Sequence, residues 1–191
     1  MELELIESQN FSGLDFSISP LVKSEFENCQ FIACNFNTVN LSDYKFIECQ
    51  FINCNLSLAK LNNTSLHAIL FKDCKMLGLS FDTCYSHTLS FKFENCNLHH
   101  SSFFQTKIKK TLFLNSKLHD VDFTACDLTL AQFLNCDLLN AKFEQTCIEK
   151  TDFRTAYNYS INLEINTIKK AKFSQLGLSG LLDKYDIEIE N

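Results

Sequence analysis

The chain of 191 residues has little of what breaks or links structure, with four glycines, one proline and no tryptophan. So few glycines argue against a glycine-rich phosphate-binding loop. No serine-rich or charge-rich tract marks a linker, so we expect one domain over residues 1–191. No apolar run reaches the roughly 18 residues of a membrane span. Residues 1–7 are acidic and lack the basic start and apolar stretch of a signal peptide, so we expect a soluble, cytoplasmic protein.

Excess charge of one sign is also scarce along most of the chain. The net charge is −6, but residues 1–10 and residues 181–191 each carry −3 of it. The segment 11–180 holds 16 acidic and 16 basic residues and is neutral. A strong acidic field over the whole surface is therefore excluded, which limits any function that depends on long-range steering.

What the chain does have is a large apolar residue at every fifth position. This pattern runs from Phe11 to Phe81 and again from Phe93 to Phe153, and, with Phe173 in the same phase, it includes 17 of the 19 phenylalanines. A period of five is neither the 3.6 of a helix nor the 2 of a flat strand. It indicates a small structural unit that is repeated along the chain.

The ten cysteines do not read as a disulfide framework. We call each apolar residue of the five-residue pattern a beat residue. Nine cysteines lie two residues before a beat position, if Ser86 is counted as a weak one, and alanine, serine and threonine also occur there; the exception is Cys147. The shared property is small size, so we expect free thiols that act as small apolar fillers. Free thiols are typical of a reducing compartment.

In each unit of five, the apolar residue and the small residue two positions before it point inward, and these two inward positions determine the expected shape. A chain that turns through about one right angle per unit closes a coil after four units of five residues. Stacked coils then share backbone hydrogen bonds at the spacing of about 4.8 Å between strands, giving about seven coils. Residues 20 apart should stack, which predicts a buried core ladder of Phe31, Phe51, Phe71, Phe113, Phe133 and Phe153.

Units such as Cys34–Asn35–Phe36, Cys126–Asp127–Leu128 and Thr151–Asp152–Phe153 carry a small residue, then Asp or Asn, then Leu or Phe. This pattern resembles the pentapeptide repeat family, which implies an all-β fold, the right-handed quadrilateral β-helix. The layout is similar to the quinolone-resistance branch of that family. It implies an N-terminal cap over residues 1–10, coils over 11–173, and a C-terminal helix and strand over 174–191 that dimerise.

Two departures from the pattern carry further expectations. The step from Phe81 to Phe93 is two residues longer than two units, so we expect a small bulge near residues 85–92 with Ser86 in a weak inward position. Such a bulge is too short for the long loop that related proteins carry. At the C-terminus we expect a helix over residues 174–182 with Leu176, Leu178, Leu181 and Leu182 inward, then an edge strand over residues 185–190. The candidate dimer interface is Leu181, Leu182, Ile187 and Ile189.

The side chains that could carry chemistry give weak patterns. His99 and His119 should be surface neighbours with His100 and Asp120 beside them, which fits either a divalent-metal patch or an exposed polar ladder. We favour the ladder and expect no metal and no cofactor. Acidic pairs lie on a convex rod rather than in a desolvated cleft, so we expect no catalytic residues and no enzyme.

An aligned apolar strip is the main candidate for a partner surface. Ile32 and Ile52 share one column, and Leu114 and Leu134 continue it. Lys109 and Lys110 belong to a lysine-rich face in the C-terminal half, which is either a binding polarity or ordinary solvated surface. Aromatic and basic residues are not interleaved, so we expect no direct nucleic-acid site.

The resemblance implies a rod-shaped homodimer that mimics duplex DNA and binds DNA gyrase or topoisomerase IV. The alternative is a generic protein-interaction scaffold with another partner, because this fold fixes architecture far better than activity.

Overall fold

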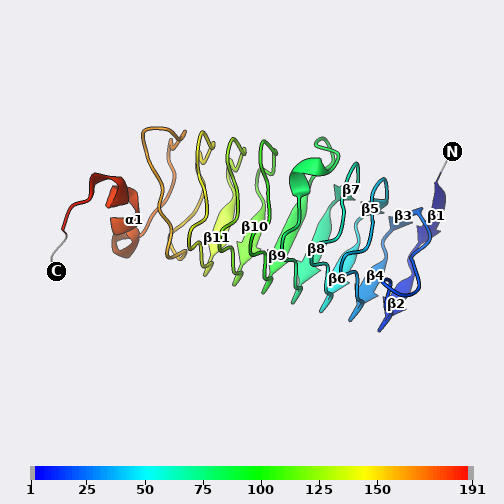
Figure 1. Ribbon diagram of the computed structural model, residues 1–191. Coiled ribbons are helices and arrows are strands. Elements are labelled where there is room, and N and C mark those ends of the chain that lie inside the picture. Colours follow the sequence, from blue (N-terminus) through cyan, green and yellow to red (C-terminus); the bar gives the residue numbers. More distant parts are fainter. Residues whose placement is uncertain (1–2, 189–191) are drawn as a thin grey trace.

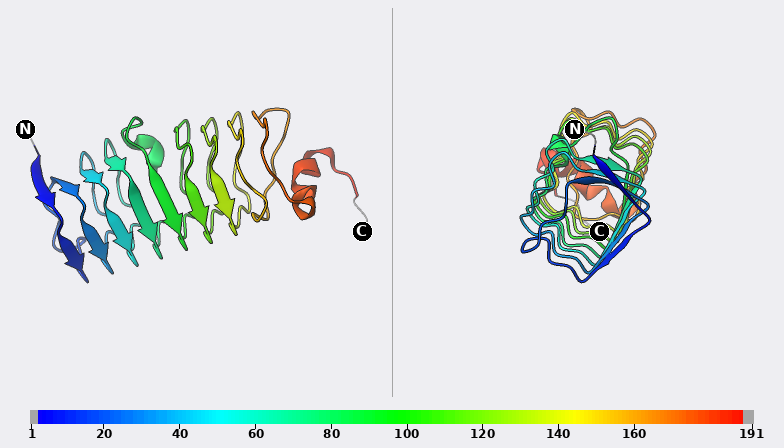
Figure 2. Two further views of the ribbon diagram at one scale, coloured as in Figure 1. Left: turned by 180° about the vertical axis from the view of Figure 1, so that it is seen from behind. Right: turned by 90° about the vertical axis from the view of Figure 1, so that its right-hand side faces the viewer.

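The computed structural model describes residues 3–188, which form a rod of stacked coils with the two ends of the chain far apart (Figure 1). Viewed along the rod, the coils outline a four-sided tube (Figure 2). The fold is a right-handed quadrilateral β-helix, as the resemblance to the pentapeptide repeat family implies. No helix among residues 3–188 is both long and apolar enough to cross a bilayer.

Parallel strands line two sides of the tube. A four-stranded sheet contains β1 (Glu4–Glu7), β3 (Ser24–Glu27), β5 (Lys45–Ile47) and β7 (Ser65–His67). A seven-stranded sheet contains β2 (Asn10–Ser12), β4 (Gln30–Ile32), β6 (Gln50–Ile52), β8 (Ile69–Lys72), β9 (Phe91–Glu94), β10 (Leu112–Leu114) and β11 (Gln132–Leu134). Because β1 already pairs with β3, the coils begin at Glu4, inside the segment that we expected to form a separate cap.

The register follows the 20-residue repeat. Phe31 pairs with Phe51 and Phe113 pairs with Phe133, and isolated bridges carry the same spacing on to Asp152 and Lys172. Each coil thus satisfies the backbone groups of the coil before it, and open sheet edges remain at the ends.

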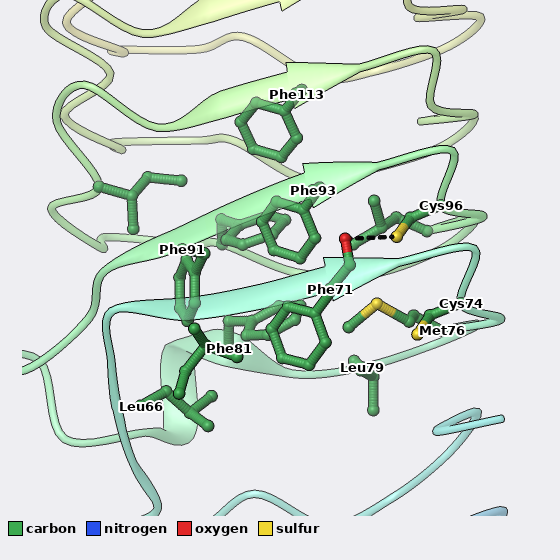
Figure 3. Close-up of a cluster of buried hydrophobic side chains, with 14 of the residues drawn as sticks. Leu66, Phe71, Cys74, Met76, Leu79, Phe81, Phe91, Phe93, Cys96 and Phe113 are labelled. Carbon is green, nitrogen blue, oxygen red and sulfur yellow. Dashed lines mark hydrogen bonds between the residues drawn. The ribbon is translucent and has the colours of Figure 1, made fainter. Parts of the chain in front are cut away.

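The core is a set of stacked phenylalanine columns. Phe31 and Phe51 stack with ring centroids 4.8 Å apart, and Phe113 and Phe133 do so at the same distance. Each of these rings is at most 1% exposed. Burying one such side chain contributes about 1.5–3 kcal/mol, so the columns are the main source of stability. Figure 3 shows Phe71, Phe93 and Phe113 in one column of the seven-stranded sheet.

The cysteines are all free, and every one except the half-buried Cys147 is buried. They also do more than fill space, because seven of the thiols donate to a backbone carbonyl one coil earlier: Cys29, Cys34, Cys49, Cys54, Cys74, Cys96 and Cys136. Cys54 Sγ lies 3.2 Å from the carbonyl oxygen of Phe31, and Thr64 Oγ1 makes the equivalent bond to Leu41 at 2.8 Å. This bond explains why serine and threonine can replace cysteine at the position, whereas alanine fits there through its small size alone.

The corners of the coils adopt a left-handed backbone. Within residues 3–188, 26 residues other than glycine have φ between 49° and 64°, nearly all at the second position after a beat residue. Such a conformation costs most residues about 1–2 kcal/mol. It is offset here because the corner N–H donates to the next coil, as from Lys110 N to Thr129 O at 2.9 Å. Asparagine is frequent at these corners, and it tolerates the left-handed region well.

The two extra residues are confirmed by the register, because β8 pairs with β9 at a spacing of 22, as in Phe71 with Phe93. They follow the short helix η1 (Phe81–Thr83). The expectation for Ser86 is wrong, since it is exposed. Leu89 packs against the core instead, and Phe91 is buried. Larger apolar side chains nearby gain more from burial than a serine does.

The C-terminal end contains η2 (Gln175–Gly177), α1 (Ser179–Leu182) and η3 (Asp183–Tyr185). A helical cap is therefore present, but the expected inward leucines are only partly correct. Leu181 is buried, whereas Leu176 is 96% exposed and Leu178 is 47% exposed. The expected edge strand is absent from residues 185–188, and Ile189 lies outside the described residues.

Candidate protein-interaction surface

The outer surface of the seven-stranded sheet, which we call the sheet face, carries the apolar residues that the sequence singled out. The register places Ile32 beside Ile52 and Leu114 beside Leu134, and all four side chains are half-buried. Between the two pairs, the same column is occupied by charged residues, Lys72 and Glu94. The expected continuous strip is therefore two separate apolar patches.

A second column of the sheet face adds to both patches. Leu70 pairs with Gln50 on one side of the break, and Leu112 pairs with Gln132 on the other. Leu70 and Leu112 are also half-buried. The sequence analysis did not include Leu70, although its 20-residue spacing from Gln50 marks it as a member of the same face.

The neighbouring side of the tube carries most of the charge, and we call it the charged face. It is the outer surface around Phe26, Phe46 and Leu66, continued after the bulge around Ile108, Leu128, Ile148 and Ile168. Its N-terminal half presents four glutamates and one lysine: Glu7, Glu25, Glu27, Glu48 and Lys45. Its C-terminal half presents six lysines and two acids: Lys107, Lys109, Lys110, Lys150, Lys169, Lys170, Asp127 and Glu149.

Lys109 and Lys110 thus belong to a different side of the tube from Leu114. Lys109 Nζ lies 3.1 Å from Asp127 Oδ2, so part of its charge is neutralised within the chain. Lys110 occupies the left-handed corner between the charged face and the sheet face. The structure does not bring the two lysines and the apolar column into one patch.

The histidines stack as the spacing predicts. The rings of His99 and His119 are parallel within 17° with centroids 4.3 Å apart, and His119 Nε2 lies 2.7 Å from Asp137 Oδ2. Burial, and then the nearby His119, lower the pKa of His99. Among residues 3–188, no group of three or more His, Cys, Asp or Glu side chains is arranged to hold a metal ion. The arrangement is that of a polar ladder on the surface.

Two carboxylates, the buried Asp152 and the half-buried Asp127, are candidates for a general acid, and their surroundings favour the charged form. The hydrogen bond from Arg154 lowers the pKa of Asp152. Burial opposes ionisation of Asp127, but bonds from Thr129 and Lys109 still lower its pKa. A general acid needs a raised pKa, so neither residue has the electrostatics of such a catalyst.

The C-terminal cap is fixed to the last coil through Tyr159. Its ring lies beside the stacked rings of Phe153 and Phe173, with centroids 5.9 Å and 5.8 Å away. Gly180 passes directly over Tyr159, where a Cβ atom would collide with the tyrosine carbonyl oxygen. The carbonyl oxygen of Gly180 accepts from the N–H of Ile161 at 2.8 Å.

This docking uses part of the expected dimer interface. Leu181 is only 8% exposed within the single chain, so it packs against its own rod. Ile187 is 55% exposed and Leu182 is half-buried, and these two keep apolar surface at the end. Beside them, Arg154, Tyr157 and the cap line a hollow of about 560 Å³.

Stacked coils with flat outer faces define a β-solenoid repeat protein. The pattern of the pentapeptide repeat region matches residues 19–92, 44–118 and 89–153, which together cover more than half of the chain. The chain belongs to the pentapeptide repeat family. No curated protein matches it at a significant level.

Two solved structures of QnrB1, described as a plasmid-mediated fluoroquinolone resistance protein, have the same fold. A trypsin-treated variant has a TM-score of 0.64 and 16% identity, covering 97% of this chain and 100% of that one. The full-length form has a TM-score of 0.50 and 18% identity, covering 96% and 100%. At these identities the likeness concerns the fold.

Proposed function

We propose that this chain is a non-catalytic binding protein of the cytoplasm that binds a type II topoisomerase, DNA gyrase or topoisomerase IV, and lessens its poisoning by quinolones. The observation that supports it is the fold shared with QnrB1 along almost the whole of both chains. This proposal assigns the chain the role of a rod that occupies the place of duplex DNA.

The sheet face is the surface that we assign to the partner. Its two apolar patches, Ile32 with Ile52 and Leu114 with Leu134, are separated by the charged residues Lys72 and Glu94. Because residues 11–180 are neutral overall, recognition would depend on shape and on these patches more than on a uniform acidic field.

We further propose that two copies join end to end through the C-terminal cap. Leu182 and Ile187 supply the apolar contact there, with Ile189 outside the described residues. Light scattering tests this, since Leu182→Asp should reduce the mass to that of a monomer.

The deciding experiment is a gyrase supercoiling assay with and without a fluoroquinolone. The wild-type protein should inhibit supercoiling at high concentration and reduce drug-stabilised cleavage at low concentration. Leu114→Asp/Leu134→Asp should abolish both effects, whereas Ile18→Asp/Leu58→Asp, which changes two exposed apolar residues elsewhere, should not. Wild-type protein without either effect at micromolar concentration would end the gyrase hypothesis.

The second candidate is a scaffold for another protein, and the interrupted apolar column favours it. Two separate apolar patches could bind two short segments of a partner protein as well as they could bind one extended surface. A host-lysate pull-down in which Leu114→Asp/Leu134→Asp loses a partner other than gyrase, with no effect in the supercoiling assay, would favour this alternative.

A further inference from the structure

The charged face has opposite charge at its two ends, and this property is independent of the proposed function. Four glutamates and one lysine occupy the N-terminal half, and six lysines and two acids occupy the C-terminal half. Glu7 and Glu27 are register partners, so two like charges lie one coil apart. Like charges so placed are destabilising, and neutral residues would serve the fold better.

Several charged side chains of the charged face form no ion pair within residues 3–188, so they are available to a partner. Glu25 pairs with Lys45, and Lys109 pairs with Asp127. Within residues 3–188, no ion pair involves Glu27, Glu48, Lys150 or Lys169. Glu48, Lys150 and Lys169 are exposed and Glu27 is half-buried, so all four can contact another molecule.

The positions of these four residues are mutually complementary. Glu27 and Lys169 both follow a beat residue by one position, and Glu48 and Lys150 both follow one by two positions. From Glu27, Glu48 lies one coil towards the C-terminus, and from Lys169, Lys150 lies one coil towards the N-terminus. Consider a second copy related by a twofold axis that lies in the plane of the charged face and runs parallel to the strands. This rotation reverses the direction of the rod, and it places each column of one copy opposite the same column of the other copy.

We propose that two copies of this chain pack side by side and antiparallel through their charged faces. The register that places Glu27 opposite Lys169 also places Glu48 opposite Lys150, and the twofold axis repeats both pairs. The same register places Ala68 opposite Leu130 and Ser65 opposite Asp127. Between the coils of residues 25–68 and 127–170, it directly opposes no two like charges.

A second copy fits this surface better than a polyanion or a polycation does. A partner of one sign would be attracted by one half of the charged face and repelled by the other. An inverted second copy supplies the opposite charge to both halves. Because exposed ion pairs are screened by salt, the association should be present at 0.1 M salt, where screening acts over about 10 Å, and lost at 1 M, where it acts over about 3 Å.

The test uses two variants and their mixture on a Leu182→Asp background, which removes the end contact proposed above. Glu27→Lys/Glu48→Lys and Lys150→Glu/Lys169→Glu should each sediment as a monomer at 0.1 M salt. An equimolar mixture should sediment as a dimer, since each variant then faces its complement. Lys72→Glu/Glu94→Lys, a matched change on the sheet face, should leave the self-association of the background protein intact.

A cross-linking readout checks the register itself. Glu48→Cys/Lys150→Cys with Cys147→Ser should form disulfide-linked dimers on oxidation, and Glu48→Cys/Lys142→Cys with the same serine change should not. A monomeric background protein at 0.1 M salt, or a mixture that stays monomeric, would overturn the proposal. So would retention of DNA or heparin by the lysine half with no effect of Glu27→Lys/Glu48→Lys on mass, which would indicate a polyanion site.

Discussion

Truncating one ring in the middle of the aromatic ladder should cost far more than truncating a ring at its end. Phe113 is fully buried and stacks on Phe93 at 5.0 Å and on Phe133 at 4.8 Å. It also meets Phe123 edge-on at 6.0 Å. Lost burial accounts for about 1.5–3 kcal/mol, and each aromatic pair adds about 0.5–1.5 kcal/mol. We therefore expect Phe113→Ala to lower the free energy of unfolding by about 3–5 kcal/mol.

The matched control is Phe11→Ala. Phe11 stacks on Phe31 at 4.8 Å but has no ring stacked on its other side among residues 3–188, and it is only partly buried. Because less contact is lost, this change should cost about half as much. Urea denaturation followed by circular dichroism measures both values. Equal costs at the two positions, or a cost below about 1 kcal/mol for Phe113→Ala, would refute the stacked-column explanation of stability.

Three further outcomes follow from the structure. A thiol reagent should label one cysteine per native chain, Cys147, because the others are buried, and burial raises the pKa of Cys136 to about 12. Gly180→Ala should loosen the C-terminal cap and increase its proteolysis, because the added methyl group meets the backbone of Tyr159. Thr38→Asn should raise the free energy of unfolding by about 0.5–1 kcal/mol, because Thr38 is β-branched and has a φ of 60°.

Each of these has a simple check. Labelling of two or more thiols in the folded protein, or labelling that survives Cys147→Ser, would contradict the burial of the columns. Ser179→Ala, one residue before Gly180 on the exposed side of the same helix, should leave proteolysis unchanged. A melting temperature for Thr38→Asn below that of the wild type would show that the corner is not under backbone strain.

The coils could be predicted because their pattern is local and is repeated many times. A wrong assignment at one unit, such as Ser86, does not change the predicted columns, because the many other repeats still define the five-residue period. At the bulge no repeat exists, and burial decides among several nearby side chains. Leu89 and Phe91 have more apolar surface than Ser86, so they enter the core.

The surface and the cap depend on contacts that no single unit encodes. The cap depends on the close approach of Gly180 to Tyr159, which involves residues 21 positions apart, and Leu176 is left 96% exposed. The left-handed corners were missed as well, although asparagines at Asn95, Asn115 and Asn135 mark them. The opposed halves of the charged face become visible only after the shift of two residues at the bulge is applied.

The bulge has a consequence for how the length of this molecule can change. Two added residues interrupt one side of the tube, where the four-stranded sheet ends at β7, but strand pairing resumes on the next side at β9. Any cut-and-rejoin that removes a whole 20-residue turn, for example residues 113–132, would leave matching edges to meet. Duplication or loss of whole coils can therefore give longer or shorter rods with the same two ends. The length of the rod can thus evolve independently of the sequences of its N-terminal and C-terminal segments.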